Sequence, residues 1–319
     1  MQKKIVCFGG GSAMPNAVLA GLKKYPVKLY GIAAMLESGG SSGQLRIDFN
    51  VLPSGDLRRQ LLALSEAPEW KKELFKFRLG RESFDDGHRG HSFGNIFISG
   101  LEYILKDFKK VLKIAHDFLE VKGEVLPATI EKGNIYAILE NGEAIFGEDE
   151  IDVPRKHNPK LKIREIFSTK KIKAYPPILK VIQEADLIII GPGDLYSSLI
   201  PCFLPQGITE AIQNSKAKKV YICNLLRKLG ETNNFTVLNF VKEIEKYLKT
   251  PVDFVIYNTK KPPIKRLAAY RKEHPEFLGL VKVNRNLSKK KFIGKDLLTK
   301  SGPVVHDSKK VVKILINLI

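Results

Sequence analysis

The chain has 319 residues, and its content of 44% hydrophobic and 27% charged residues excludes a disordered protein and provides for a large core. Its three cysteines lie in apolar segments without metal-type spacing, and no apolar stretch reaches the ~18 residues that span a bilayer, which favours a cytoplasmic location. The formal net charge of +19 attracts polyanions, but lysine pairs without a basic-aromatic stripe are more typical of a solvated surface than of a specific nucleic-acid site.

A glycine turn follows the first expected strand. Residues 4–8 form a β-prone apolar run, residues 9–12 read GGGS, and a helical pattern with Val18, Leu19 and Leu22 on one side comes next. A strand that ends in glycines before a helix directs backbone N–H groups toward an anion. The turn matches neither G-x-G-x-x-G nor a P-loop. It indicates a phosphate site, with a turn that binds nothing as the alternative.

A second strand is expected over residues 27–34, and it ends in a glycine-serine loop at residues 39–43. The sequence PSGD at residues 53–56 predicts a helix start with Asp56 as N-cap. This helix has an apolar face of Leu57, Leu61 and Leu64 and ends at Pro68.

Residues 69–121 have a helical pattern without a convincing strand, which predicts a helical insertion that caps the sheet edge. A polar patch, GHSFGN at residues 90–95, precedes its apolar helix. His91 and Asn95 are four residues apart and would share a helix face if the helix began near Ser92. The alternative for both residues is helix capping alone.

Three short strands are expected over residues 125–129, 135–139 and 144–146. The Asn141-Gly142 pair between the last two is the strongest short signal for a β-hairpin. Residues 152–173 are polar and interrupted by prolines, which indicates a loop or the return to the main sheet.

Strands and helices alternate clearly from residue 174 onward. Strands are expected over residues 185–190, 219–223 and 253–257, and helices over residues 177–184, 207–215 and 236–248. Continuous apolar strands separated by helices predict an α/β Rossmann-like, doubly wound and mainly parallel sheet with helices on both faces. The strands end in Gly191–Asp194, Asn224 and Asn258, and because ligands of such sheets bind at the carboxyl ends of strands, these loops should converge on one crevice.

The residues near this crevice favour binding over acid-base chemistry. No Ser-His-Asp order and no G-x-S-x-G motif is present. The crevice carboxylates are Glu37, Asp56, Asp194 and Glu231, of which Glu37 follows a strand beside a glycine loop and suits magnesium on a phosphate, or only a loop role. Backbone N–H groups, hydroxyls and amides outnumber them and suit a phosphorylated, sugar-bearing ligand.

Several motifs occur along the chain in a fixed order. They are GGGS at residues 9–12, GGSSGQLR at 39–46, PSGDLR at 53–58, GHSFGN at 90–95, VLPAT at 125–129, GPGDLYSS at 191–198, CN at 223–224, GET at 230–232 and HD at 306–307. In this set and order the chain resembles the CofD/YvcK family over nearly its whole length.

The resemblance implies a Rossmann-like fold that binds a nucleotide-containing ligand. CofD proteins transfer a 2-phospholactyl group from a guanylate-linked donor to a deazaflavin acceptor with magnesium. YvcK proteins bind a UDP-sugar and are linked to carbon-source-dependent growth, cell shape and cell-wall precursor supply. The motifs GGSSG, GHSxGN and GPGxLYxS look like the YvcK branch.

Three positions depart from the family pattern. The aspartate pair that usually precedes GGSSG is Glu37-Ser38, the arginine that usually follows it is Gln44, and LLRKL at residues 225–229 replaces a Met-Thr-Gln stretch. The first change removes one carboxylate from the pair that would organise a metal in a transferase.

We therefore expect one domain over residues 1–319, with the cap at 69–121 within it, and a nucleotide-sugar-binding regulator of carbon metabolism and cell-wall supply. The alternative is a CofD-type 2-phospho-L-lactate transferase, which would need magnesium held by Glu37 and Asp56; the regulator needs no cofactor, metal ligand or catalytic residue. No specific nucleic acid is expected as a partner, and a homo-oligomer stays open. The expected ligand-binding residues are Gly9, Gly10, Gly11, Ser12, Glu37, Gly39, Gly40, Ser41, Ser42, Gly43, Arg46, Asp56, His91, Asn95, Gly191, Pro192, Gly193, Asp194, Ser197 and Asn224.

Overall fold

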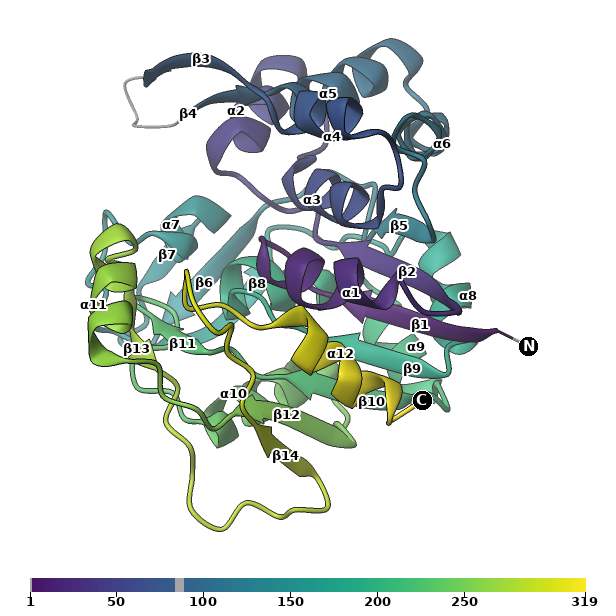
Figure 1. Ribbon diagram of the computed structural model, residues 1–319. Helices are drawn as coiled ribbons and strands as arrows, with labels where there is room; N and C mark the ends of the chain where they lie inside the picture. Colours follow the sequence, from purple (N-terminus) through teal and green to yellow (C-terminus); the bar gives the residue numbers. More distant parts are fainter. Residues whose placement is uncertain (1, 84–88) are drawn as a thin grey trace.

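The computed structural model describes residues 2–83 and 89–319, and a seven-stranded sheet in the order β14-β12-β10-β9-β1-β2-β5 runs through it (Figure 1). All neighbouring strands in this sheet are parallel, which confirms the expected doubly wound α/β fold. The strands are β1 (Lys3–Phe8), β2 (Val27–Ala33), β5 (Glu124–Pro127), β9 (Leu187–Ile190), β10 (Lys218–Ile222), β12 (Phe254–Asn258) and β14 (Phe292–Lys295).

The two central strands are continuous apolar runs because both of their faces are covered. Residues 5–8 of β1 and all of β9 are fully buried. From β1 the chain continues to β2 on one side, whereas β9 pairs with β1 on the other side and leads away to β10 and β12. The strand order therefore reverses between β1 and β9, which is the position where ligands bind in open parallel sheets.

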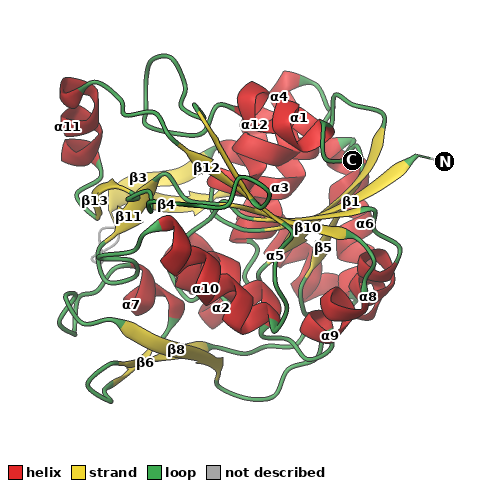
Figure 2. Ribbon diagram, turned by 90° about the horizontal axis from the view of Figure 1, so that it is seen from below, coloured by secondary structure: helices red, strands yellow, loops and turns green. Residues whose placement is uncertain are grey.

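Helices cover both faces of this sheet, as Figure 2 shows. One face carries η1 (Pro15–Leu19), α1 (Ala20–Leu22), α3 (Gly55–Leu64) and α12 (Ser308–Ile316), and the other carries α8 (Pro176–Gln183), α9 (Ile208–Asn214) and α10 (Val237–Leu248). The helix α10 shows how the sequence selects this packing. Its buried residues Val237, Phe240, Val241, Ile244 and Leu248 recur at helical spacing, so one stripe faces the sheet.

The Asn-Gly hairpin is confirmed by β6 (Ile135–Leu139) and β7 (Ala144–Phe146), which pair antiparallel. The expectation of a loop or return over residues 152–173 was incomplete. That segment contains β8 (Ile163–Ser168), which pairs with the other edge of β6, and it follows the short helix α7 (Glu148–Asp152). Only Ile163 and Ile166 of β8 are buried, so the strand lacks the alternating pattern that would reveal it.

The cap contains the expected helices α4 (Glu69–Lys76), α5 (Phe93–Leu105) and α6 (Phe108–Leu119), which lie together with α2 at the top of Figure 1. The expectation of no strand is wrong, because β3 (Arg78–Ser83) and β4 (Arg89–Ser92) pair antiparallel. Both strands are polar and carry no apolar alternation. Residues 84–88 of this segment lie outside the described residues.

Three local expectations at helix starts are corrected. The glycine-serine loop is the first turn of α2 (Gly40–Phe49), and α3 begins at Gly55 with Ser54 as N-cap, so Asp56 is inside the first turn. The helix α5 begins at Phe93, which leaves His91 in β4 and off the helix face of Asn95. For α2 and for Asp56 a tertiary contact, described below, accompanies the difference, whereas the start of α5 is set locally because the hydroxyl of Ser92 accepts from the N–H of Asn95.

No element was expected beyond Asn258, and this region forms one wall of the site. It contains α11 (Ile264–Glu273), β13 (Phe277–Leu280), which pairs antiparallel with β11 (Leu226–Lys228), and a long segment that leads to α12. A small separate core of Leu225, Leu226, Leu298 and Val304 holds these parts together. The helical turns η2 (Leu195–Leu199) and η3 (Ile200–Phe203) follow β9.

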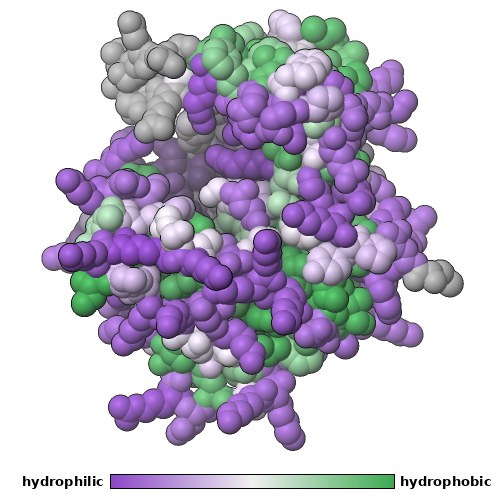
Figure 3. Space-filling view, in the orientation of Figure 1, coloured by the Kyte–Doolittle hydropathy of each residue, from purple (hydrophilic) through white to green (hydrophobic). Residues whose placement is uncertain are grey.

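Hydrophilic side chains are spread over the face shown in Figure 3, and apolar surface gathers mainly over the cap helices at the top. This distribution agrees with a solvated surface on that face. Among the residues that the structure describes, no helix combines the length and the apolar character needed to cross a membrane.

Candidate functional site

The two glycine loops lie against each other at the carboxyl ends of β1 and β9. A Cβ atom placed on Gly9 would be 3.2 Å from the carbonyl oxygen of Pro192, and one on Gly193 would be 3.4 Å from the backbone nitrogen of Gly10. The contact at Gly9 is tighter than a side chain allows without a shift of its neighbours, whereas a Cβ on Gly193 would make an ordinary van der Waals contact. The loops after β1 and β9 therefore converge, as expected, at the point where the strand order reverses, and Asn224 lies beside them, whereas Asn258 lines a separate cavity.

A cavity of about 320 Å³ opens beside these loops, within the size range of small-molecule sites. Its polar side comprises Gly10, Gly11, Ser12, Gly193, Asp194, Asn224 and His306. Its apolar side comprises Leu225, Leu226, Tyr270, Phe277, Pro303, Val304 and Val305. Sequence reasoning missed Tyr270 and Phe277, because α11 and β13 show no clear periodicity, whereas His306 belongs to the HD motif.

Two buried polar atoms of the cavity lining have no hydrogen-bond partner within the described ranges. They are Oδ1 of Asn224 and Nε2 of His306. The amide nitrogen of Asn224 donates to the carbonyl oxygen of Gly193 at 2.8 Å, which fixes the side chain between the two loops. Unpartnered buried polar atoms are rare in native proteins, so both atoms are positions where a ligand would complete the hydrogen bonding.

Burial lowers the pKa of His306 to about 4, although a hydrogen bond to the backbone of Cys223 opposes the shift. The imidazole is therefore neutral at physiological pH, and its Nε2 is available as an acceptor if Nδ1 carries the proton.

This shift predicts a specific acid sensitivity. Because the folded-state pKa of His306 lies below its ordinary value of 6.5, the contribution to stability is complete above pH 6.5 and is lost as the pH falls toward 4. We expect the His306→Gln variant to lose less stability than the wild type between these pH values in urea unfolding. Parallel pH profiles of the two proteins would contradict the assignment.

The first glycine loop is already contacted by a carboxylate of the chain. The N–H of Gly11 donates to Oδ1 of Asp56 at 2.7 Å. Asp56 is 1% exposed, and its burial, together with the charge of Glu37, raises its pKa. Asp56 is therefore not the N-cap of its own helix, a position that Ser54 takes. It supports the glycine loop that follows the neighbouring strand β1.

Asp56 and Glu37 form a carboxylate pair whose positive partner is Arg59. Nη1 of Arg59 lies 2.8 Å from Oδ1 of Asp56 and 3.7 Å from Oε1 of Glu37. Oε1 of Glu37 also accepts from the N–H of Asp56, and Oε2 accepts from the hydroxyl of Ser42. A Cβ on Gly10 would lie only 1.9 Å from Oδ2 of Asp56, so this oxygen, the fourth of the pair, lies against the backbone of Gly10.

This arrangement does not fit the magnesium ion that a CofD-type transferase would use. Each carboxylate oxygen but one accepts a protein hydrogen bond, and the remaining Oδ2 of Asp56 is buried against Gly10. The guanidinium of Arg59 already supplies the positive charge. Magnesium requires several open oxygen ligands and retained waters, for which this pair offers no space.

The GGSSG segment forms a second structural cluster around the start of α2. The N–H groups of Ser38 and Gly39 donate to Oε2 of Glu148 at 3.2 and 3.3 Å, and burial raises the pKa of this carboxyl. Glu148 thereby satisfies two backbone N–H groups just before α2, which supports a helix start at a glycine-serine sequence. Arg46 donates to the carbonyl oxygens of Glu37 and Gly133.

Asn95 and His91 are brought together by Ser41. The hydroxyl of Ser41 lies 3.1 Å from Nδ1 of His91 and 3.2 Å from the amide nitrogen of Asn95. Oδ1 of Asn95 accepts from Nε of Arg58 at 2.9 Å, and Asn95 is 3% exposed. The side chain of Asn95 therefore joins the cap to α3 and is not part of the cavity lining beside the loops.

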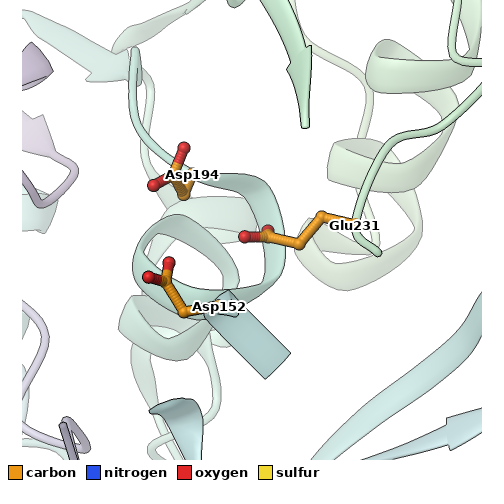
Figure 4. Close-up of side chains that lie close together, drawn as sticks. All are labelled: Asp152, Asp194 and Glu231. Carbon is orange, nitrogen blue, oxygen red and sulfur yellow. The ribbon is translucent and has the colours of Figure 1, made fainter. Parts of the chain in front are cut away.

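The second loop is supported by a buried carboxylate in the same way as the first. Oε2 of Glu231 accepts from the N–H of Tyr196 at 2.7 Å, and its Oε1 accepts from the hydroxyl of Ser197 at 3.0 Å. The same hydroxyl donates to Asp152 at 2.8 Å. The side chains of Glu231, Asp152 and Asp194 lie close together (Figure 4), and Nζ of Lys228 contacts all three.

The structure thus divides the expected site residues into those that line the cavity and those that support it. Gly10, Gly11, Ser12, Pro192, Gly193, Asp194 and Asn224 line the cavity. Glu37, Gly39 to Gly43, Arg46, Asp56, His91, Asn95 and Ser197 belong to the supporting clusters, and Gly9 and Gly191 complete the turns behind the lining. Glu148 and Asp152 were missed because only long-range contacts bring them there, and Arg59 and Lys228 were missed although each is three residues from a carboxylate that it contacts.

Fold and site together define an open parallel α/β protein with a preformed pocket at the reversal of its strand order. The chain belongs to the CofD family, because the family model described as 2-phospho-L-lactate transferase CofD matches residues 5–300. This membership confirms the resemblance found in the sequence.

Relatives extend over most or all of the chain. A Thermotoga maritima protein is 39% identical over 87% of this chain and 85% of its own length. The gluconeogenesis factors of Listeria innocua and Bacillus subtilis are 34% and 33% identical, each over 100% of this chain and over 96% and 98% of their own lengths. A crystal structure of a Bacillus halodurans protein superposes with a TM-score of 0.89 at 33% identity, covering 99% of this chain and 100% of that one.

Proposed function

We propose that this chain binds a nucleotide-linked sugar in the pocket beside the two glycine loops and acts as a regulator of carbon metabolism and cell-wall precursor supply. The pocket carries the proposal, since it combines an apolar aromatic wall with two unpartnered acceptors and backbone loops. The names of the Listeria innocua and Bacillus subtilis relatives, gluconeogenesis factor, support a role in carbon metabolism.

The nucleoside would occupy the pocket between Tyr270 and the first glycine loop. Tyr270 and Phe277 are stacked at 5.9 Å between ring centroids and offer a flat apolar surface to a base. Oδ1 of Asn224 and Nε2 of His306 would accept hydrogen bonds, so the ligand should present donors such as an imide N–H or ribose hydroxyls. A uracil base meets this requirement.

The phosphate and sugar would extend from there toward a second cavity. This cavity, of about 550 Å³, shares Asn224 and Leu225 with the first and is bordered by Lys260, Lys261 and Lys282. Three ammonium groups attract a diphosphate, and the strand end at Asn258 in the same lining offers a polar side chain to the sugar.

A ligand panel tests this assignment. We expect UDP-glucose or UDP-N-acetylglucosamine to raise the melting temperature, because a ligand at ~100 times its dissociation constant stabilises by about 2.7 kcal/mol, and ADP- and GDP-linked sugars in the same panel compare the bases. Asn224→Ala should weaken binding about tenfold or more, whereas Asn141→Ala, in the exposed hairpin turn, should leave it unchanged. Absence of any nucleotide-dependent shift in wild-type protein would refute the proposal.

The transferase alternative rests on the description of the family model. Phosphoryl chemistry of that kind needs a metal to neutralise developing charge, and Glu37 and Asp56 are engaged by Arg59. We expect a UDP-sugar to bind equally with magnesium or with chelator, Glu37→Gln to change affinity by only a few fold, and no product to form. Metal-dependent turnover in mass spectrometry, lost in Glu37→Gln, would establish the transferase instead.

A further inference from the structure

Three carboxylates from distant segments meet next to the second glycine loop (Figure 4). Asp152 ends α7, Asp194 follows β9, and Glu231 lies in the turn after β11. One oxygen from each lies within 4.8 Å of the other two, a spacing at which carboxylates surround a metal ion. Three negative charges at this spacing repel one another unless a cation lies between them.

The cation in this protein is the ammonium group of Lys228. Nζ is 3.0 Å from Oδ2 of Asp194 and 3.2 Å from Oε1 of Glu231, and it also donates to Asp152. The lysine side chain is only 7% exposed. An ammonium group has three hydrogens to donate, and here each of three carboxylates can receive one.

The position of this ammonium matters for the pocket because its partners support the second loop. Glu231 receives the N–H groups of Tyr196 and Ser197 at the start of η2. Asp194 is the residue before that turn and also lines the cavity. Lys228 therefore links the acidic cluster to the wall against which a ligand would lie.

We propose that Lys228 is a built-in cation that takes the place of a divalent metal at this cluster and positions Asp194 and η2 for ligand binding without metal. The effect on ligand binding rests on the proposed function. The replacement of a metal ion by the ammonium group of Lys228 does not depend on nucleotide binding. Lys228 is a positioning residue, since it acts on the pocket through Asp194 and Glu231.

Replacement of the lysine by manganese tests the inference, with Mn²⁺ alone as the probe. Lys228→Met keeps the length of the side chain and removes the charge, so the three carboxylates become a divalent-metal site. We expect one Mn²⁺ per chain to bind this variant in electron paramagnetic resonance titrations and to recover most of the melting temperature that the substitution costs. The wild type and Lys228→Arg should show neither effect.

A second substitution locates the metal, and a refolding experiment tests the inference if the first variant does not fold. Asp152→Asn in the Lys228→Met background should abolish both Mn²⁺ binding and thermal recovery. If Lys228→Met does not fold without metal, refolding in Mn²⁺ but not in chelator also shows that the metal replaces the ammonium group. The inference would be overturned if the wild type bound one Mn²⁺ per chain and Asp152→Asn removed this binding. It would also be overturned if a folded Lys228→Met bound no Mn²⁺. A wild type that binds no nucleotide would overturn only the proposed function.

Discussion

Gly10→Ala should both destabilise the protein and abolish ligand binding, although alanine is the smallest possible change. The added methyl group would lie 1.9 Å from Oδ2 of Asp56 and 3.0 Å from Cβ of Ser198. Asp56 cannot move away without giving up its bonds to Gly11 and Arg59. Overpacking of this kind costs about 1–3 kcal/mol, and the disturbed buried carboxylate adds to it, so we expect about 3 kcal/mol in urea unfolding.

Gly11→Ala is the matched control for this substitution. A Cβ on Gly11 meets no atom within 4 Å, but its φ of +61° lies in the left-handed region, so only about 1 kcal/mol of backbone strain is expected. The double variant Gly10→Ala/Asp56→Ala removes the group that the new methyl contacts and should show a favourable coupling energy. A Gly10→Ala protein as stable as wild type would show that the loop and Asp56 are not in contact.

The glycine turn is sensitive to substitution for a different reason from the one that its sequence alone suggests. A G-G-G-S turn before a helix predicts backbone N–H groups open to a phosphate. In the folded protein, Asp56 takes the N–H of Gly11, Glu148 those of Ser38 and Gly39, and Glu231 those of Tyr196 and Ser197. Motif spacing located the loops correctly but could not reveal carboxylates that come from up to 110 residues away.

The sheet was predictable for a physical reason that does not apply to the pocket wall. Strands such as β1 and β9 are buried on both faces, so each is a continuous apolar run that a local window detects. The helix α11 has no buried residue, and β13 has only one, so neither carries a periodic signal. Tyr270 and Phe277 become lining residues only because β13 pairs with β11.

The difference between local and tertiary signals also explains why a helix start was predicted incorrectly. Glycine and serine have low intrinsic helix propensity, which made residues 39–43 look like a loop. Glu148 accepts from the backbone N–H groups just before this helix, and it belongs to a segment that the chain reaches only after the hairpin. Local preference is a weak guide where a tertiary partner caps the helix.

Glu231→Ala should cause the largest loss of stability among single substitutions of the residues that support the second loop. The side chain is 3% exposed and accepts from two backbone N–H groups, one hydroxyl and the ammonium of Lys228. Removal of one member of a buried charged cluster typically costs about 3–5 kcal/mol, because its partners remain buried without it. Urea unfolding should show this loss, and Glu143→Ala, in the exposed hairpin turn, should show none.

Glu231→Gln separates the charge of this side chain from its shape. Burial raises the pKa of Glu231 to about 7, with the charges of Asp194 and Asp152 acting in the same direction and Lys228 opposing them. A carboxyl whose folded-state pKa lies above its ordinary value of 4.5 keeps its proton longer in the folded protein, so this group's contribution to stability falls as the pH rises from about 4.5 to about 7. The glutamine variant cannot titrate, so its stability relative to wild type should improve across this interval. A constant difference between the two proteins from pH 4.5 to 7.5 would mean that the ammonium of Lys228 outweighs burial and keeps Glu231 ionised throughout.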